Sequence, residues 1–249
     1  MPRRTMNDSD DVPSPSSRTS RKDKTRLASK ELQQLLTSFD EIRSKYETSE
    51  ISRSIEKLLK NVSKTTGPPT RVLSLGLGSF GPIKSRTRRL KQLAIFLGIA
   101  TTLQWITNAP IALFAQDPTF SRFDEAFLAT FGIAVVRTPS GSELGEAEHL
   151  VDESTLIYSP FLTLEAYQSL LLRSVRCVKY LVGDDFNSLL LKWPKHSAER
   201  DQVEKLIKMS ISRSRRREIR GDGFWNEEDK TFPMAMYSFE NRLQKIAKA

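Results

Sequence analysis

The residues best suited to chemistry lie in a glycine-rich segment, residues 76–81, with the sequence G-L-G-S-F-G. The segment matches G-x-G-x-x-G, and it follows an apolar run typical of a strand and precedes a helical pattern. There, glycines permit a tight turn, and backbone N–H groups can approach a phosphate whose charge the helix N-terminus favours. We predict that Gly76, Gly78, Ser79 and Gly81 face an anionic ligand. A tight strand-to-helix turn without a ligand is the alternative.

Four basic residues crowd the start of the helix that follows: Lys84, Arg86, Arg88 and Arg89. Positive charge at a helix N-terminus opposes the helix dipole and costs about 0.3–1 kcal/mol for each exposed group. A bound anion, or nearby acidic side chains, would offset that cost. We expect Lys84 and Arg86 to contact the anion; solvated basic side chains are the alternative.

Three further polar residues lie where predicted parallel strands end, which is where open α/β sheets bind ligands. Asp117 ends the second strand, where a dinucleotide site places a carboxylate on the ribose hydroxyls. It comes 36 residues after Gly81, whereas about 20 is usual. A turn aspartate that fixes the following Pro-Thr backbone is an equally good interpretation. Ser159 and Asp184, at the ends of the fourth and fifth strands, complete the predicted ligand-facing set.

Catalytic and metal-binding residues are hard to find in this sequence. His149 and His196 lie in polar segments, and the glycine segment does not match the G-x-S-x-G of hydrolases. One cysteine and two isolated histidines cannot form a Cys/His zinc site, and Cys177 is expected to be a buried, inert thiol. Asp184 and Asp185 offer oxygen ligands to a cation, but helix capping is favoured. We therefore predict no catalytic residue and no metal, and the sequence names no cofactor.

Short apolar runs alternate with helical patterns between residues 71 and 190, which predicts a Rossmann-like α/β domain. We expect a doubly wound, mostly parallel, five-stranded sheet in an order such as 3-2-1-4-5, with helices on both faces. The predicted strands are Arg71–Leu75, Ile111–Gln116, Ile133–Arg137, Thr155–Tyr158 and Val178–Val182. The predicted helices are Ser85–Leu103, Ser121–Phe131, Glu143–Val151 and Leu162–Ser174.

The flanking segments differ from this domain in composition. Residues 1–28 are polar and basic and are expected to be disordered. Residues 29–66 have apolar residues at helical spacing, which predicts two amphipathic helices or one helix bent near Thr48. Residues 191–249 are predicted to form a basic helix, Ala198–Ile219, and an aromatic tail that packs back on the domain.

The net charge of +9 comes from the flanks, with +4 over residues 1–70, 0 over residues 71–190 and +5 over residues 191–249. Basic flanks around a neutral domain predict electrostatic contacts made by the appendages. The densest run, Arg213 to Arg220, has three interpretations: contact with nucleic acid or a nuclear import receptor, phosphorylation of its interleaved serines, or a solvated helix face.

The composition also indicates in which cellular compartment the protein is expected. A chain of 249 residues that is 38% hydrophobic can form one good-sized domain. It has one cysteine, no run of about 18 apolar residues and no apolar stretch near its first residues. We therefore predict no disulfide, no membrane contact and no secretory signal, and we expect a protein of the cytoplasm and nucleus.

Three motifs together resemble the SRR-like domain family, named for reduced sensitivity to red light. They are V-L-S-L-G-L-G-S-F at 72–80, Q-L-A at 92–94 and D-P-T-F at 117–120. The resemblance spans about Arg71 to Asn187. It implies a eukaryotic regulatory protein with a Rossmann-like domain and no firmly assigned reaction. Family members are associated with light and circadian signalling, regulation of haem biosynthesis, and development.

The chain departs from the family pattern at two strand ends. The family commonly has Pro-His-Cys after the fourth strand, where this chain has S-P-F at 159–161. The family commonly has Gly-Asn-Ser-Phe after the fifth strand, where this chain has G-D-D-F at 183–186. The sequence therefore resembles a divergent member, and we do not expect it to perform chemistry that depends on that histidine or cysteine.

Three functions follow as hypotheses. The first is an SRR-like regulatory protein that binds a protein partner or an anionic small molecule, either a nucleotide or S-adenosylmethionine, and that is more a binding protein than an enzyme. The alternative is an S-adenosylmethionine- or nucleotide-dependent enzyme, methyltransferase-like, in which residues 159–161 face the reacting group. The third is nucleic-acid binding through the basic flanks, with an affinity that falls steeply as salt rises.

Overall fold

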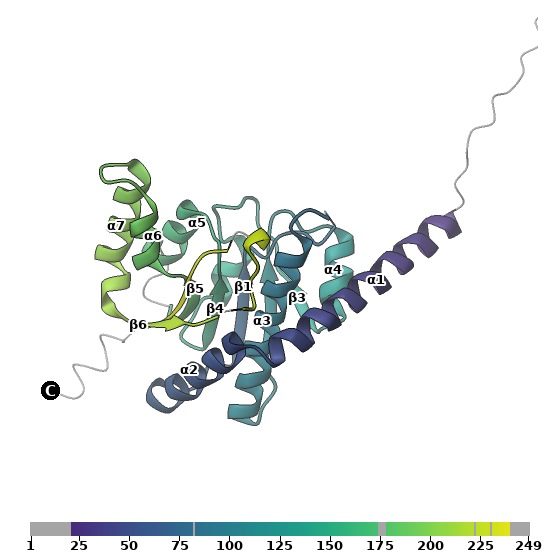
Figure 1. Ribbon diagram of the computed structural model, residues 1–249, viewed down its shortest axis with the longest axis horizontal. Helices are drawn as coiled ribbons and strands as arrows, with labels where there is room; N and C mark the ends of the chain where they lie inside the picture. The colour runs from purple at the N-terminus through teal and green to yellow at the C-terminus, as the bar shows by residue number, and fades with distance from the viewer. Residues whose placement is uncertain (1–20, 82, 174–177, 222, 230, 240–249) are drawn as a thin grey trace, which may run out of the picture.

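The computed structural model describes residues 21–81, 83–173, 178–221, 223–229 and 231–239. Within these residues seven strands form one sheet in the order β3-β2-β1-β4-β5-β7-β6 (Figure 1). The strands are β1 (Arg71–Leu75), β2 (Ala112–Gln116), β3 (Ile133–Val135), β4 (Thr155–Ser159), β5 (Tyr180–Asp184), β6 (Ser214–Ile219) and β7 (Met234–Phe239). Strands β1 to β5 pair in parallel, and β7 is antiparallel to both of its neighbours. The fold is mixed α/β.

The predicted order of the first five strands is confirmed, but the predicted strand number is wrong. The C-terminal flank adds β6 and β7 to the sheet. The predicted helix Ala198–Ile219 ends at Met209, and the rest of it is a short turn followed by β6. β6 is an edge strand, and edge strands tolerate charged side chains on both faces, so its sequence has no apolar alternation. β7 is buried between β5 and β6, which explains the apolar residues of the tail.

Helices cover both faces of the sheet. One core lies under α1 (Arg21–Glu47), α2 (Glu50–Thr66), α3 (Arg86–Thr107) and α4 (Arg122–Ala129). The other lies under η1 (Gly145–Leu150), α5 (Leu164–Gln168), η2 (Ser169–Arg173), α6 (Phe186–Lys192) and α7 (Ala198–Met209). Two further turns are η3 (Ile211–Arg213) and η4 (Glu227–Asp229). The central strands β1, β4 and β5 are apolar on both faces because helices bury both sides.

The N-terminal helices are part of the fold. α1 and α2 are separated at Thr48 and Ser49, where the Ser49 hydroxyl accepts from the Ser52 N–H and caps α2. α1 packs on α3 through a stripe of buried side chains: Leu35, Phe39, Ile42 and Tyr46. α1 begins at Arg21, within the segment 1–28 that the sequence predicts to be disordered. Residues 1–20 lie outside the described residues.

Three other sequence predictions have structural outcomes. The predicted helix Glu143–Val151 is a short 3-10 helix, and the predicted helix from Leu162 is α5 followed by a π-helical turn. Cys177 lies outside the described residues. Within the described part of the chain, no helix is long and apolar enough to cross a bilayer.

Candidate functional site

A cavity of about 250 Å³ lies at the carboxyl ends of β1, β2 and β4. Its walls come from the turn after β1, the end of β2, the loop after β3 and the turn after β4. The lining residues are 75–76, 116–119, 140–144, 161–163 and Ala166. β1 lies between β2 and β4, where the strand order changes direction, and open α/β sheets bind ligands at such a point. This cavity, the strand-end cavity, is therefore the candidate site.

Asp117 lines this cavity at the end of β2. Its Oδ1 accepts from the N–H of Thr119 at 2.8 Å and from the hydroxyl of Thr119 at 2.5 Å. Its Oδ2 accepts from the Gly78 N–H at 2.7 Å. A carboxylate has about four acceptor positions, so one position on Oδ2 is left for a hydroxyl donor. Asp117 thus fixes its own turn, as one interpretation predicts, and also lines the cavity with one acceptor position unused.

The glycine segment does not form the predicted phosphate cradle. The N–H groups of Gly78 and Ser79 donate to Asp117 and to the Thr119 hydroxyl. The Phe80 N–H donates at 2.7 Å to Oδ1 of Asp124, a fully buried carboxylate at the start of α4. The Gly81 N–H donates to the hydroxyl of Ser79. The chain's own acceptors therefore occupy the amides that the sequence analysis assigns to an anion.

The glycines serve a tight turn. Gly76 and Gly78 have φ of +75° and +77°, a region that side chains with a Cβ rarely adopt. A Cβ at Gly76 would lie 2.9 Å from Cδ1 of Leu162, and one at Gly78 would lie 2.7 Å from Nε of Arg89. Of the four segment residues predicted to face a ligand, only Gly76 lines the cavity. The turn without a phosphate is the interpretation that matches this geometry.

The basic residues after the turn bind the turn itself. Arg86 donates through Nε to the Phe80 carbonyl at 2.9 Å and through Nη2 to the Gly81 carbonyl at 2.5 Å. Arg89 donates to the Ser79 carbonyl. Lys84 is exposed and lies outside the cavity lining, so neither Lys84 nor Arg86 contacts the candidate site. The carbonyls of the turn therefore accept from Arg86 and Arg89 without a bound anion.

Gln116 is a site residue that the sequence analysis missed. This buried side chain at the end of β2 donates through Nε2 to the Leu144 carbonyl and, at 3.4 Å, to the Arg137 carbonyl. It thereby holds the loop after β3 against the cavity. The sequence has a polar residue at the end of a predicted strand, just before the candidate carboxylate, and this pattern could have identified Gln116.

The turn after β4 contributes Phe161, and Asp184 holds that turn in place. Phe161 has φ of +64°, which is uncommon for a non-glycine residue. Its N–H donates at 2.9 Å to Oδ1 of Asp184, whose side chain belongs to the end of β5. Asp184 is only 3% exposed and does not line the cavity. Its relation to the site is therefore indirect, through Phe161.

Burial raises the pKa of Asp184 to about 7, because desolvation disfavours the carboxylate. Hydrogen bonds from the Phe161 N–H and the Tyr167 side chain, and the charge of Lys192, act in the opposite direction. Ser159, at the end of β4, is also fully buried, and its Oγ has no hydrogen-bond partner among the described residues. Asp184 and Ser159 thus lie behind the cavity wall, whereas the sequence analysis places them facing the ligand.

Asp185 has the capping role that the sequence favours. Its carboxylate accepts from the Asn187 N–H at the start of α6 and, at 2.8 Å, from the Ser188 hydroxyl. Two bonds of 2.6 Å come from Nε and Nη2 of Arg216 on β6. The guanidinium group of Arg216 is therefore bound by another residue of the same fold. In the described residues, no group of three or more His, Cys, Asp or Glu is arranged to hold a metal ion.

A comparison with protein-family models identifies the family to which this chain belongs. The SRR1 domain matches residues 33–243, which is most of the chain. The chain belongs to the SRR1 domain family. The matched range includes the second half of α1 and all of α2, β6 and β7, so the family domain is wider than the Arg71–Asn187 span suggested by the motifs. No curated protein sequence matches this chain.

Solved structures resemble the fold at low sequence identity. Cofactor-bound Rv0187 from MTB is 10% identical, with a TM-score of 0.48 over 84% of this chain and 90% of that one. A putative class I S-adenosylmethionine-dependent methyltransferase from Listeria monocytogenes is 11% identical, with a TM-score of 0.46 over 78% of this chain and 60% of that one. The Methanococcus jannaschii fibrillarin pre-rRNA processing protein is 12% identical, with a TM-score of 0.41 over 70% and 68%. At these scores the likeness carries no argument about function.

Proposed function

We propose that this SRR1 domain is a binding module that takes the nucleoside part of a small molecule in the strand-end cavity, with S-adenosylmethionine as the first candidate. One observation carries the proposal: the cavity lies where the strand order reverses, and the Asp117 carboxylate borders it with one acceptor position unused. A ribose hydroxyl is a donor of suitable size and charge for that position.

The size of the cavity favours the binding of one end of a ligand over the binding of a whole dinucleotide. Its volume of about 250 Å³ is below the roughly 300–1,000 Å³ of typical small-molecule pockets. The loop amides are occupied, so the site has no cradle for a pyrophosphate. We expect adenosine and S-adenosylmethionine to bind more tightly than NAD or ATP.

Two glycines provide a matched test of this site. Gly141 lines the cavity, and an added Cβ would be in ordinary contact, 3.7 Å from Pro118. Gly81 is outside the cavity, and an added Cβ there would also be in ordinary contact, 3.5 Å from Ser79. Gly141→Leu should lower the calorimetric affinity for S-adenosylmethionine at least tenfold, and Gly81→Leu should leave it unchanged. Equal affinities in the two variants, or no binding to the wild type, would refute the proposal.

A methyltransferase-like enzyme is the second candidate function. It is favoured by Asp184, whose pKa of about 7 suits a general acid or base near neutral pH. Against it, the buried Asp184 lies behind Phe161, and neither Ser159 nor Pro160 reaches the cavity. Formation of S-adenosylhomocysteine in the presence of candidate acceptors distinguishes the enzyme from the binding module.

We further propose that the module acts in regulation, of the signalling, developmental or clock type that the family resemblance implies, through protein partners in the cytoplasm and nucleus. Nucleic-acid binding is a less favoured proposal for the C-terminal flank. Arg216 forms two hydrogen bonds with the Asp185 carboxylate. Arg217 is half-buried, and its Nη1 atom is shielded from solvent. The arginine run is also an edge strand, not a helix face.

A further inference from the structure

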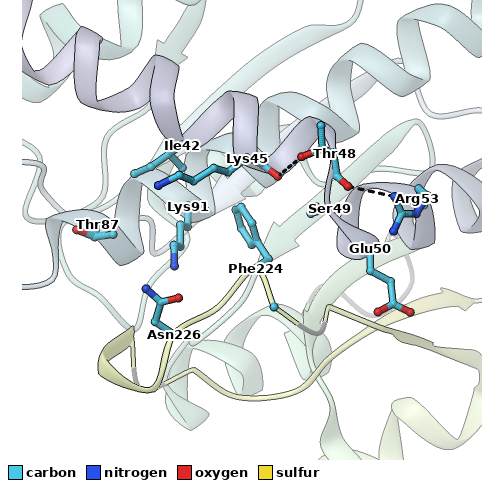
Figure 2. A pocket seen from close by; sticks show the side chains of 11 residues that line it. Ile42, Lys45, Thr48, Ser49, Glu50, Arg53, Thr87, Lys91, Phe224 and Asn226 are labelled. Carbon is cyan, nitrogen blue, oxygen red and sulfur yellow. Dashed lines mark hydrogen bonds between the residues drawn. The ribbon is translucent and has the colours of Figure 1, made fainter.

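A second cavity, the helix-junction pocket, lies where the turn between α1 and α2 meets α3 and the segment after β6. Its volume is about 560 Å³, and Figure 2 shows the side chains around it. It is lined by residues 42, 45, 48–50 and 53 from α1, α2 and their turn, by Thr87 and Lys91 from α3, and by Gly223, Phe224 and Asn226. It shares no lining residue with the strand-end cavity.

Donor groups gather on one side of this pocket. Figure 2 shows the nitrogen ends of Lys45, Lys91 and Asn226 on the same side of Phe224, while the Glu50 carboxylate lies on the other side. Arg53 adds a further positive charge, and its Nη1 donates at 3.1 Å to the carbonyl of Thr48. Lys45 and Arg53 outweigh Glu50, because Lys91 is balanced by Asp229. The pocket therefore has a positive charge and a donor-rich side.

Asp229 holds the Lys91 ammonium and the Asn226 backbone in place. Its Oδ2 accepts from the Nζ of Lys91 at 2.6 Å and from the backbone N–H of Asn226 at 2.8 Å. The Lys91–Asp229 pair is buried, with side chains 7% and 6% exposed. Leaving either buried charge without its partner is costly, so Asp229 keeps the Lys91 ammonium in this position. An ammonium group has three donors, and two of those on Lys91 are not used by Asp229.

The walls around these donors are rigid. The Thr48 hydroxyl donates at 3.3 Å to the Lys45 carbonyl, which closes the turn between the two helices. Phe224 is 6% exposed and packs edge-on against Tyr46 and Trp225, with ring centroids 5.7 and 5.2 Å apart. The Lys91 ammonium is already held by Asp229, so this donor loses little side-chain entropy when a ligand binds.

We propose that the helix-junction pocket is a second binding site, for a small phosphate-bearing metabolite whose phosphate is bound by Lys45, Lys91 and Asn226. A phosphate monoester accepts several charge-assisted hydrogen bonds at once, and these three donors lie on one side of the same pocket. The volume lies within the roughly 300–1,000 Å³ of small-molecule sites. The inference is independent of the proposed function.

Ribose 5-phosphate and ribose are the probes, because they differ only in the phosphate. Binding is measured by isothermal calorimetry and by the fluorescence of Trp225 in a Trp105→Phe, Trp193→Phe background. We expect ribose 5-phosphate, but not ribose, to bind and to change the fluorescence. No binding of ribose 5-phosphate, or equal binding of ribose, would overturn the proposal.

Charge reversal on α1 locates the site. Lys45→Glu should weaken ribose 5-phosphate binding at least tenfold, whereas Lys30→Glu, an exposed change on the same helix, should weaken it less than threefold. Asn226→Ala tests a second donor without disturbing the buried ion pair, and it should also weaken binding. Equal losses in the Lys45 and Lys30 variants would show non-specific attraction. A loss caused by Gly141→Leu would place the ligand in the strand-end cavity. Either result would overturn the proposal.

Discussion

Asp184 and Asp185 are adjacent in sequence but have opposite electrostatic surroundings. Burial raises the pKa of Asp184 to about 7. Burial acts in the same direction on Asp185, but the Arg216 and Ser188 hydrogen bonds outweigh it and lower the pKa of that carboxyl. Side chains alternate across a strand and its continuation, so the two carboxyls point to different neighbours. Of these two carboxyls, only that of Asp184 is therefore expected to change charge near neutral pH.

The first prediction concerns Asp184 and pH. Its native pKa of about 7 lies above the ordinary value of 3.8, so the folded state binds the proton more tightly than the unfolded state. The free energy of unfolding should therefore fall as pH rises from about 4 to about 7, by at most about 4 kcal/mol from this group.

Urea unfolding at pH 5.5 and pH 8 measures the part of that fall that lies above pH 5.5. Asp184→Asn keeps an oxygen for the Phe161 N–H but cannot titrate, so the variant should lose this part of the pH dependence. Glu165→Gln, an exposed change on α5, should keep it. The same pH dependence in the wild type and in Asp184→Asn would contradict the assignment.

At the scale of elements, β6 shows how a basic segment becomes part of a sheet. It pairs with β7 along its full length, and Ile219 is buried at its end. Arg216 reaches from this edge to Asp185 at the start of α6, so the edge strand and the helix are joined by a two-bond ion pair. The charged sequence of β6 also protects an exposed edge from pairing with another chain.

The second prediction concerns this ion pair. The Asp185 side chain is 3% exposed, and Arg216→Ala would leave it without its positive partner. Because the Arg216 side chain is one-third exposed, water replaces part of the loss, and we expect a destabilisation of about 1–3 kcal/mol. Thermal or urea unfolding measures this change. Arg213→Ala, an exposed arginine just before β6, should change stability by less than about 0.5 kcal/mol. Equal effects would show that the ion pair does not stabilise the fold.

At the scale of the whole molecule, α1 and α2 complete one of the two cores. Tyr46 of α1 packs over Gly98 of α3, where an added Cβ would lie 2.2 Å from its ring. Phe39 packs edge-on against Phe127 of α4, with ring centroids 6.3 Å apart. The Rossmann-like sheet therefore depends on segments outside residues 71–190.

The third prediction tests that dependence by truncation. Removing residues 1–48 deletes α1 and, among its described residues, four buried side chains, each worth about 1.5–3 kcal/mol. The total is comparable to the roughly 5–15 kcal/mol stability of a typical domain, so the truncated chain should lose its cooperative thermal transition or become insoluble. Removing residues 1–20 should leave the transition unchanged. A cooperative fold in the longer truncation would show that α1 is dispensable.

The candidate site was only partly predictable from the sequence. Gly76 and Asp117 line the cavity because position after a parallel strand is a local property that the chain order reveals. The roles of Ser79, Gly81 and Arg86 were not predictable, because they depend on which acceptors and donors fold back onto the turn. Asp124 is the decisive partner, and it lies 44 residues from the Phe80 amide that it accepts from.

The sequence by itself determined the family, the α/β class and the order of five strands, since motif spacing and apolar periodicity are local in the chain. The tertiary structure decided that the turn after β1 satisfies its own amides, that a basic segment is the seventh strand in the sheet order, and that Lys45, Lys91 and Asn226 meet in one pocket. The physical reason is that charge neutralisation and hydrogen bonding act between groups close in space, and their distance along the chain does not restrict them.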